Sequence, residues 1–273
     1  MMRYDAHIHH ADGKCSPAQF VEKLSAAGID GGAVFSQSPV AAFERDGIVH
    51  PAGVRIENVM AFTAGRETLY PFFFIDPTEA DAPKQVDMAL AAGIAGFKTI
   101  CTHFYPNDPR AIEVYHRVAA SGKPYLFHSG ILFDGANASG DFNRPCNFEV
   151  LLRVPRLRFA LAHVGWPWCD ECIAVYAKCQ HLRSVMDPHD APEMFIDTTP
   201  GTPPSYRKSL LRKLIAMGAQ DHMLWGSDAT TGYDDRMAIS IRARDEGIMD
   251  KADAPEDMLE RWYDKNFMRF LKG

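Results

Sequence analysis

Short apolar runs alternate along the chain with longer stretches of mixed character. The runs end at Gly, Pro or polar residues and are too short for helices, so they predict strands. Eight such runs are present, at residues 4–8, 32–35, 70–75, 96–100, 124–127, 157–162, 194–196 and 223–225. The stretches between them repeat apolar residues at helical spacing and predict helices at residues 17–27, 82–92, 109–121, 147–154, 170–179 and 205–217.

A chain that alternates strands with helices favours a parallel sheet whose faces are covered by helices. Dividing the 273 residues among eight strand-helix units gives about 34 residues per unit, which suits a (β/α)8 TIM barrel. A doubly wound open sheet has similar spacing, but no glycine-rich dinucleotide turn follows the first run. The pattern therefore predicts an α/β protein with one (β/α)8 TIM-barrel domain over residues 1–273.

Composition agrees with a packed chain and narrows the list of partners. Hydrophobic residues make up 47% and charged residues 23%, which excludes disorder, collagen and coiled coil as descriptions of the whole chain. The net charge of -6 argues against an electrostatic nucleic-acid binder. No run approaches the roughly 18 apolar residues of a membrane-spanning helix, and no signal-peptide core follows the first positive charge. We expect a cytoplasmic protein without a membrane partner, whose cysteines, including Cys169 and Cys172, are free thiols.

Four of the eight runs end in residues of the types that bind metals: His7 with His9, His128, His163, and Asp228. Residues i and i+2 of a strand point to one face, so His7 and His9 present two imidazoles side by side while Ile8 faces away. A single histidine at a strand end is ordinarily a buried, hydrogen-bonded residue. All of these residues together predict a divalent metal site at the C-terminal mouth of the barrel, where active sites of this fold lie.

These motifs resemble the amidohydrolase superfamily of metal-dependent barrels, and in particular the branch called amidohydrolase family 2. The segments that carry the resemblance are residues 5–9, 96–98, 108–110, 124–130, 162–167, 225–228 and 265–271. The last of them resembles the closing helix of the branch, so we expect a C-terminal helix at about 255–271 that packs on the barrel. Asp228-Ala229-Thr230 departs from the common Asp-x-Pro of the family, which bears on the shape of the last loop.

The resemblance implies that His7, His9, His128 and Asp228 bind one divalent metal, with zinc expected first and manganese or iron as alternatives. It also implies that His163 and Asp228 are catalytic. Zinc suits nitrogen and carboxylate ligands, and it lowers the pKa of a bound water toward ~7. Asp228 can then accept a proton from that water, and His163 can polarise a substrate oxygen or donate a proton.

Three further residues are candidates for substrate contact. Lys98 ends the fourth run, where binuclear members of the superfamily carry a carbamylated lysine that bridges two metals. We expect a substrate or structural contact from Lys98 instead, and two metal equivalents per chain would indicate the bridge. His103 lies in a loop over the same mouth, and Arg144 lies in the long loop after the fifth run, where it could contact a carboxylate.

The leading hypothesis is a metal-dependent hydrolase that cleaves an amide, ester or lactone bond of a small organic acid. The alternative that uses the same residues is a non-oxidative decarboxylase of an aromatic or unsaturated carboxylic acid. A metal-dependent nuclease is disfavoured because related nucleases carry Glu where this chain has Gly96-Phe97-Lys98. A non-catalytic barrel is disfavoured because none of the expected ligands is replaced. The expected partner is a small carboxylate-type substrate, and a homodimer is left open.

Overall fold

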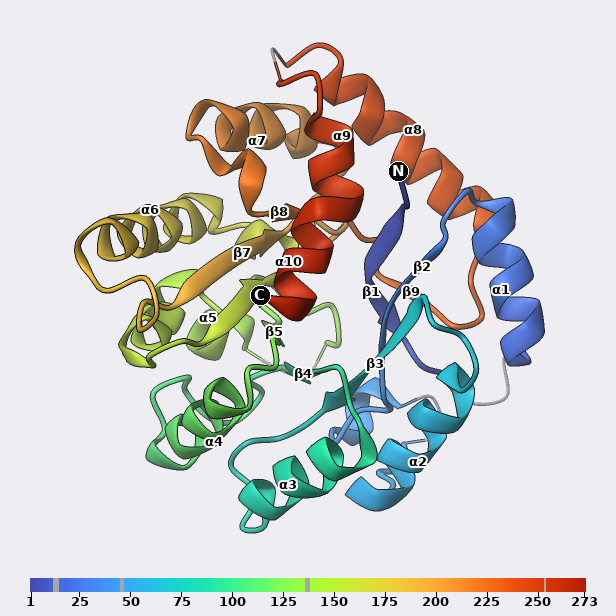
Figure 1. The fold of residues 1–273 in the computed structure, drawn as a ribbon, viewed down its shortest axis with the longest axis vertical. Helices are drawn as coiled ribbons and strands as arrows, with labels where there is room; N and C mark the ends of the chain where they lie inside the picture. Colours follow the sequence, from blue (N-terminus) through green and yellow to red (C-terminus); the bar gives the residue numbers. More distant parts are fainter. Residues whose placement is uncertain (12–14, 45–46, 136–137, 253) are drawn as a thin grey trace.

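A ring of parallel strands with helices outside it forms the centre of the molecule, seen along its shortest axis in Figure 1. This computed structural model describes residues 1–11, 15–44, 47–135, 138–252 and 254–273. The strands are β1 (Tyr4–His9), β2 (Gly31–Phe35), β3 (Leu69–Phe74), β4 (Gly96–Thr99), β5 (Tyr125–Phe127), β6 (Arg158–Leu161), β7 (Glu193–Asp197), β8 (Met223–Leu224) and β9 (Ala229–Thr230).

The strand order confirms the predicted (β/α)8 barrel. Each strand from β1 to β7 pairs in parallel with the next, β8 pairs with β7, and β9 pairs with β1. Strands β8 and β9 are two short parts of the eighth unit. The amide of Ala6 also donates to the carbonyl of Trp225 at 2.9 Å, which joins the first strand to the eighth unit and closes the ring.

The helices that surround the strands are α1 (Pro17–Ala26), α2 (Ala52–Thr63), α3 (Ala82–Ala92), α4 (Pro109–Ser121), α5 (Ser139–Phe142), α6 (Cys169–Val185), α7 (Pro204–Ala216) and α8 (Asp235–Met249). Short 3₁₀ segments lie at Ala41–Phe43, Pro145–Arg153, Ala162–Gly165 and Ala219–Asp221. The chain ends in α9 (Met258–Glu260), a π turn (Arg261–Lys265) and α10 (Asn266–Lys272). No helix in the described ranges has the length and apolar character needed to cross a bilayer.

Local sequence accounts for several helix ends. Ser16 and Gln19 form a reciprocal capping box at the start of α1. Asp108 caps α4 through the amide of Arg110, and Pro109 occupies the first turn, where a missing amide hydrogen costs nothing. Gly122 ends α4 in the left-handed conformation, which favours glycine.

Several helical segments differ from the sequence-based expectation, among them the short helix α5, which was not predicted. The helix predicted at 147–154 is instead 3₁₀ structure at Pro145–Arg153. The sequence pattern did not predict α2 and α8, because each buries a charged side chain on the face that should be apolar. Arg55 of α2 donates to the carbonyls of His50 and Phe74, and Asp245 of α8 forms a bidentate pair with buried Arg207 at 2.5 and 2.6 Å. Hydrogen bonding compensates both buried charges. A charged residue at a buried position nevertheless interrupts the apolar repeat by which a helix is recognised in the sequence.

An extra residue in β1 changes which side chains enter the barrel. Asp5 pairs with Gly32 and Ile8 pairs with Val34, so three steps along β1 match two steps along β2. This is the pattern of a β-bulge. Tyr4 and Ala6 therefore pack in the inner cluster, whereas Ile8 packs in the outer one. The rings of the histidines that flank Ile8 lie against Phe35, an inner residue.

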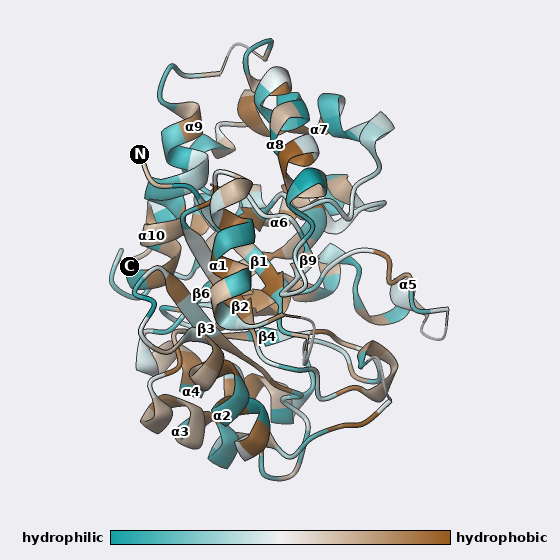
Figure 2. Ribbon diagram, turned by 90° about the vertical axis from the view of Figure 1, so that its right-hand side faces the viewer, coloured by the Kyte–Doolittle hydropathy of each residue, from teal (hydrophilic) through white to brown (hydrophobic). Residues whose placement is uncertain are grey.

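The C-terminal helix closes the end of the barrel where the strands begin. Phe270 of α10 packs against Phe72 of β3 and Phe195 of β7, with ring centroids 6.4 and 5.3 Å apart. Phe267 stacks on Tyr4 of β1 at 4.8 Å. Figure 1 shows α10 across the centre of the ring, and Figure 2 shows hydrophobic strands inside helices of mixed polarity. The functional end of the barrel is thus the opposite one, where the strands end.

We expect Phe270→Ala to lower the free energy of unfolding by about 3 to 5 kcal/mol, because it leaves a cavity between α10 and two strands. The measurement is urea denaturation followed by circular dichroism. Lys272→Ala, at an exposed position in the same helix, is the control and should change stability little. A loss below about 1 kcal/mol for Phe270→Ala would show that α10 does not hold this end of the barrel closed.

Candidate metal centre

His7 is fixed by a carboxylate on a strand that is not its neighbour. Its Nδ1 lies 2.6 Å from Oδ2 of Asp197 at the end of β7, and both side chains are buried. Burial and the nearby Lys98 together lower the pKa of His7 to about 3 despite the opposing effect of Asp197 and Asp228, so the ring is neutral at pH 7. A neutral ring that donates from Nδ1 to a carboxylate carries its lone pair on Nε2.

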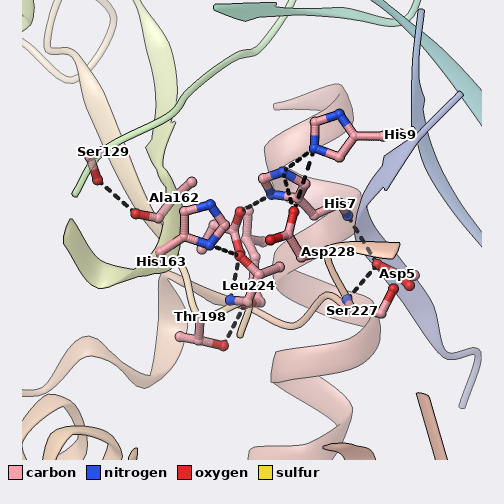
Figure 3. Close-up of polar contacts among 12 residues, drawn as sticks. Asp5, His7, His9, Ser129, Ala162, His163, Thr198, Leu224, Ser227 and Asp228 are labelled. Atoms are coloured by element: carbon pink, nitrogen blue, oxygen red, sulfur yellow. Dashed lines mark hydrogen bonds and ion pairs between the residues drawn. The ribbon is translucent and has the colours of Figure 1, made fainter. Parts of the chain in front are cut away.

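Two further ligand-type atoms lie close to this nitrogen (Figure 3). Nε2 of His7 lies 3.1 Å from Nε2 of His9 and 3.3 Å from Oδ1 of Asp228, and the distance from His9 Nε2 to the same oxygen is 3.5 Å. Bonds of about 2.0 to 2.1 Å from zinc to four tetrahedral ligands put those ligands about 3.3 Å apart. The lone pair of His7 and the Asp228 carboxylate would repel each other without a cation between them, so the cluster fits a metal ion.

Asp228 reaches the cluster through an unusual backbone. Its φ angle is 59°, in the left-handed region that non-glycine residues rarely adopt. Gly226 allows this approach, because a Cβ there would lie 2.5 Å from Thr199 Cγ2 and 3.0 Å from His7 Cβ. Burial raises the pKa of Asp228, but the imidazoles of His163, His7 and His9 together lower it far below its usual value. The side chain is therefore ionised at neutral pH, and it is 34% exposed.

A buried acid ties the first strand to the eighth unit. Oδ1 of Asp5 accepts from the amides of His7 at 3.0 Å and Ser227 at 2.9 Å. Its other oxygen accepts from the hydroxyl of Tyr233 at 3.0 Å. Burial raises the pKa of Asp5 to about 6. Asp5 thus holds in place the two backbone segments that carry His7 and Asp228.

His163 stands next to the cluster on a constrained turn. His163, Val164 and Gly165 all have positive φ angles, of 59°, 51° and 65°, and such strain collects at functional sites. Nδ1 of His163 lies 2.8 Å from the hydroxyl oxygen of Thr199. A Cβ at Gly201 would lie 2.4 Å from His163 Cγ, so only glycine lets the chain cover this ring. Burial lowers the pKa of His163, which favours the neutral ring.

His128 and Lys98 face the same region with unpartnered atoms. Nε2 of His128 and Nζ of Lys98 are buried and have no hydrogen-bond partner among the described residues. Both residues line a cavity of about 1220 Å³ that His9, His163 and Asp228 also line. The ring of His128 is 5.0 Å from that of His163, although His128 is outside the compact group of three ligand atoms. Burial lowers the pKa of Lys98 and the carboxylates of Asp197 and Asp228 partly oppose it, so the pKa is about 8 and the ammonium persists at pH 7.

The structure does not bring His103 and Arg144 to this cavity. His103 is 57% exposed, and its Nε2 lies 3.3 Å from Oδ2 of Asp76. Arg144 donates through Nε to Glu171 Oε1 at 3.0 Å and lies over the ring of Trp168. Neither residue is among those that line the cavity. Each is held by an acidic partner close to it in space.

Sequence reasoning missed the residues that support the histidines. Asp197 directly follows the seventh apolar run, 194–196, and Thr199 lies two residues further on, so the strand-end rule that selected the other site residues also applies to this segment. Gly201 and Gly226 carry no comparable signal in the sequence. A position requires glycine only when atoms of another segment lie where a Cβ would be, and those atoms are known only from the structure.

Comparisons with known proteins identify the family and the fold. A family model described as amidohydrolase matches residues 4–272. No protein of curated function matches the chain. One solved structure with a similar fold is a probable 2-pyrone-4,6-dicarboxylic acid hydrolase from Acinetobacter baumannii with bound citric acid, at 12% identity over 99% of each chain and a TM-score of 0.65. A second is an amidohydrolase from Burkholderia multivorans with bound zinc, at 10% identity over 99% of each chain and a TM-score of 0.66. A third is amidohydrolase 2 from Bifidobacterium longum subsp. infantis, at 13% identity over 99% of this chain and 98% of that chain and a TM-score of 0.58. At such identities the likeness shows the fold.

We expect Asp197→Asn to weaken zinc binding by roughly 10- to 100-fold, because an amide does not hold the hydrogen of His7 on Nδ1. The measurement is competition for zinc between the protein and a chelator. Asp190→Asn, at an exposed position before β7, is the matched control and should leave the affinity unchanged. An affinity of Asp197→Asn within about threefold of the original protein would contradict the orienting role of Asp197.

Proposed function

Because the chain belongs to the amidohydrolase family, we propose that it is a metal-dependent hydrolase that cleaves an amide, ester or lactone bond of a small organic acid. The observation that carries this proposal is the cluster of ligand atoms from His7, His9 and Asp228, which lie 3.1 to 3.5 Å apart. The choice of hydrolysis draws support from the similarity in fold to a protein described as a probable 2-pyrone-4,6-dicarboxylic acid hydrolase.

In this proposal one divalent ion is held by His7, His9 and Asp228, with His128 as the fourth ligand. His128 qualifies because its Nε2 is buried without a partner among the described residues and the residue lines the same cavity. Nitrogen ligands with one carboxylate suit zinc, and manganese or iron are the alternatives. A bound ion would act as a Lewis acid toward the scissile carbonyl and lower the pKa of water toward ~7.

Asp228 and His163 are the groups that move protons in this proposal. The Asp228 carboxylate is ionised and one third exposed, so it can accept a proton from the attacking water. Nδ1 of His163 is engaged by Thr199, so the neutral ring can take up at Nε2 the proton that Asp228 accepts from water and pass it to the leaving group. Thr199 and Gly201 restrict the ring, so the proton is delivered from a fixed position.

The same residues could serve a non-oxidative decarboxylase, so the first experiment separates the two reactions. Metal-loaded protein is incubated with esters, lactones and amides of carboxylic acids, and separately with free aromatic and unsaturated acids. Release of acid from the first set without carbon dioxide from the second supports hydrolysis. Carbon dioxide from the free acids, with no cleavage of the first set, contradicts it. One metal equivalent per chain is expected, and two would indicate a bridge through carbamylated Lys98.

We expect His163→Asn to lower kcat by roughly 10²- to 10⁴-fold while metal content is unchanged, because the substitution removes a proton donor and no proposed ligand. His7→Ala should lose the metal together with activity. Metal analysis and steady-state kinetics on the most active substrate make the comparison. His181→Asn, at an exposed position of α6, is the control. Undiminished turnover in His163→Asn would contradict the role of His163.

A further inference from the structure

The cavity beside the ligand cluster is large for a short organic acid. Its volume of about 1220 Å³ exceeds the roughly 300 to 1,000 Å³ of ordinary small-molecule sites. Strand ends line its floor, and the segments after β2 and β5 line its mouth. A substrate of a few carbon atoms would leave most of this space to water.

The floor carries one side chain that is cationic at pH 7. Lys98 of β4 is fully buried, and its Nζ has no hydrogen-bond partner among the described residues. The ring of Phe35 lies beside it, with Nζ 5.3 Å from the ring centroid. No other lysine or arginine lines the cavity among the residues that the structure describes. A buried ammonium without a partner is costly, so an anionic group of a ligand is the natural partner for Lys98.

The mouth carries an apolar surface that faces solvent. Phe133, in the loop after β5, lines the cavity and is 78% exposed. Its ring is nearly parallel to that of Trp166, at an interplanar angle of 12° and a centroid distance of 6.3 Å. The half-buried Ile131 and Leu132 precede Phe133 and line the same cavity. Large exposed side chains of this kind at the rim of a cavity are typical of a surface that is covered when a ligand binds.

Acidic side chains at the mouth restrict the charge that a ligand can carry at that end. Glu44 and Asp134 line the cavity from the segments after β2 and β5, and Asp134 directly follows Phe133 in the chain. A second anionic group on the ligand would approach these carboxylates at the rim, where like charges repel. The charge pattern therefore favours one anionic group at the floor and none at the mouth.

From these observations we propose that the substrate is an amphiphilic monocarboxylate. Its free carboxylate binds Lys98, its apolar or aromatic end packs on Ile131, Leu132 and Phe133, and the bond to be cleaved lies between the two. This assignment rests on the proposed function for the position of the cleaved bond. The recognition of the two ends does not depend on turnover and can be tested by binding alone.

Calorimetric titration of metal-loaded and metal-stripped protein with four probes tests the assignment. The probes are 4-phenylbutyrate, butyrate, 4-phenylbutan-1-ol and 4-(4-carboxyphenyl)butyrate. We expect 4-phenylbutyrate to bind at least tenfold more tightly than each of the other three. Butyrate that binds as tightly as 4-phenylbutyrate overturns the apolar contact. The alcohol binding equally tightly overturns the anionic contact, and the dicarboxylate binding equally tightly overturns the restriction at the mouth.

Variants assign each preference to its residue. Phe133→Ala should reduce the preference for 4-phenylbutyrate over butyrate, while Tyr105→Ala, an exposed aromatic residue outside the cavity, should not. Lys98→Met should abolish the preference for the acid over the alcohol in metal-stripped protein, and Lys178→Met is the surface control. A preference that survives Lys98→Met but vanishes with the metal overturns the role of Lys98. Circular dichroism checks that each variant folds. The relative affinities of the four probes for the unaltered protein test the proposal even where a variant does not fold.

The outcomes also separate this inference from the proposed function. Selective binding of 4-phenylbutyrate without hydrolysis of any ester, lactone or amide supports the inference and contradicts the proposed function. Hydrolysis of short acyl substrates together with equal binding of all four probes supports the function and overturns the inference.

Discussion

The buried hydrogen bond between His7 and Asp197 is the constraint on which the arrangement of the mouth depends. It connects β1 to β7, which are not adjacent in the ring, across the eighth unit. Because the hydrogen of His7 is committed to Nδ1, its lone pair on Nε2 has one direction. The short distances to His9 and Asp228 follow from that direction. A ring free to rotate would leave those two residues without a third partner.

The same region buries several groups whose charges are balanced locally. Asp197 is compensated by the hydrogen of His7 and by the amide of Thr199 at 2.8 Å, and Asp5 by two amides and a phenol. Lys98 is the exception, because its ammonium is buried without such a partner among the described residues. The rings of His7 and His163 beside Asp197 and Asp228 are neutral, so these carboxylates carry negative charge that a divalent cation would offset.

The two ends of the barrel have different roles, because one is packed for stability and the other carries the residues of the candidate site. At the end where the strands begin, aromatic side chains of α10 fill the ring and the contacts are apolar. At the end where the strands finish, His163, Val164 and Asp228 hold left-handed backbone conformations that a free peptide would avoid. The hydroxyl of Ser129 donates to the carbonyl of Ala162 at 2.7 Å and joins the segments that carry His128 and His163. The packed end thus supplies the rigidity that the strained end requires.

The sequence by itself determined the barrel and the strand-end positions of its histidines, because short uncharged runs at regular spacing have few other stable arrangements. It could not reveal α2 and α8, whose buried Arg55 and Asp245 break the apolar period and are compensated only by partners distant in sequence. It also could not reveal the bulge in β1 that turns Tyr4, Ala6, His7 and His9 to one side. The tertiary structure also decided that His103 and Arg144 lie outside the cavity and that Asp197 orients His7. The reason is that hydrogen bonds and close approaches between distant segments exist only once the ring has closed.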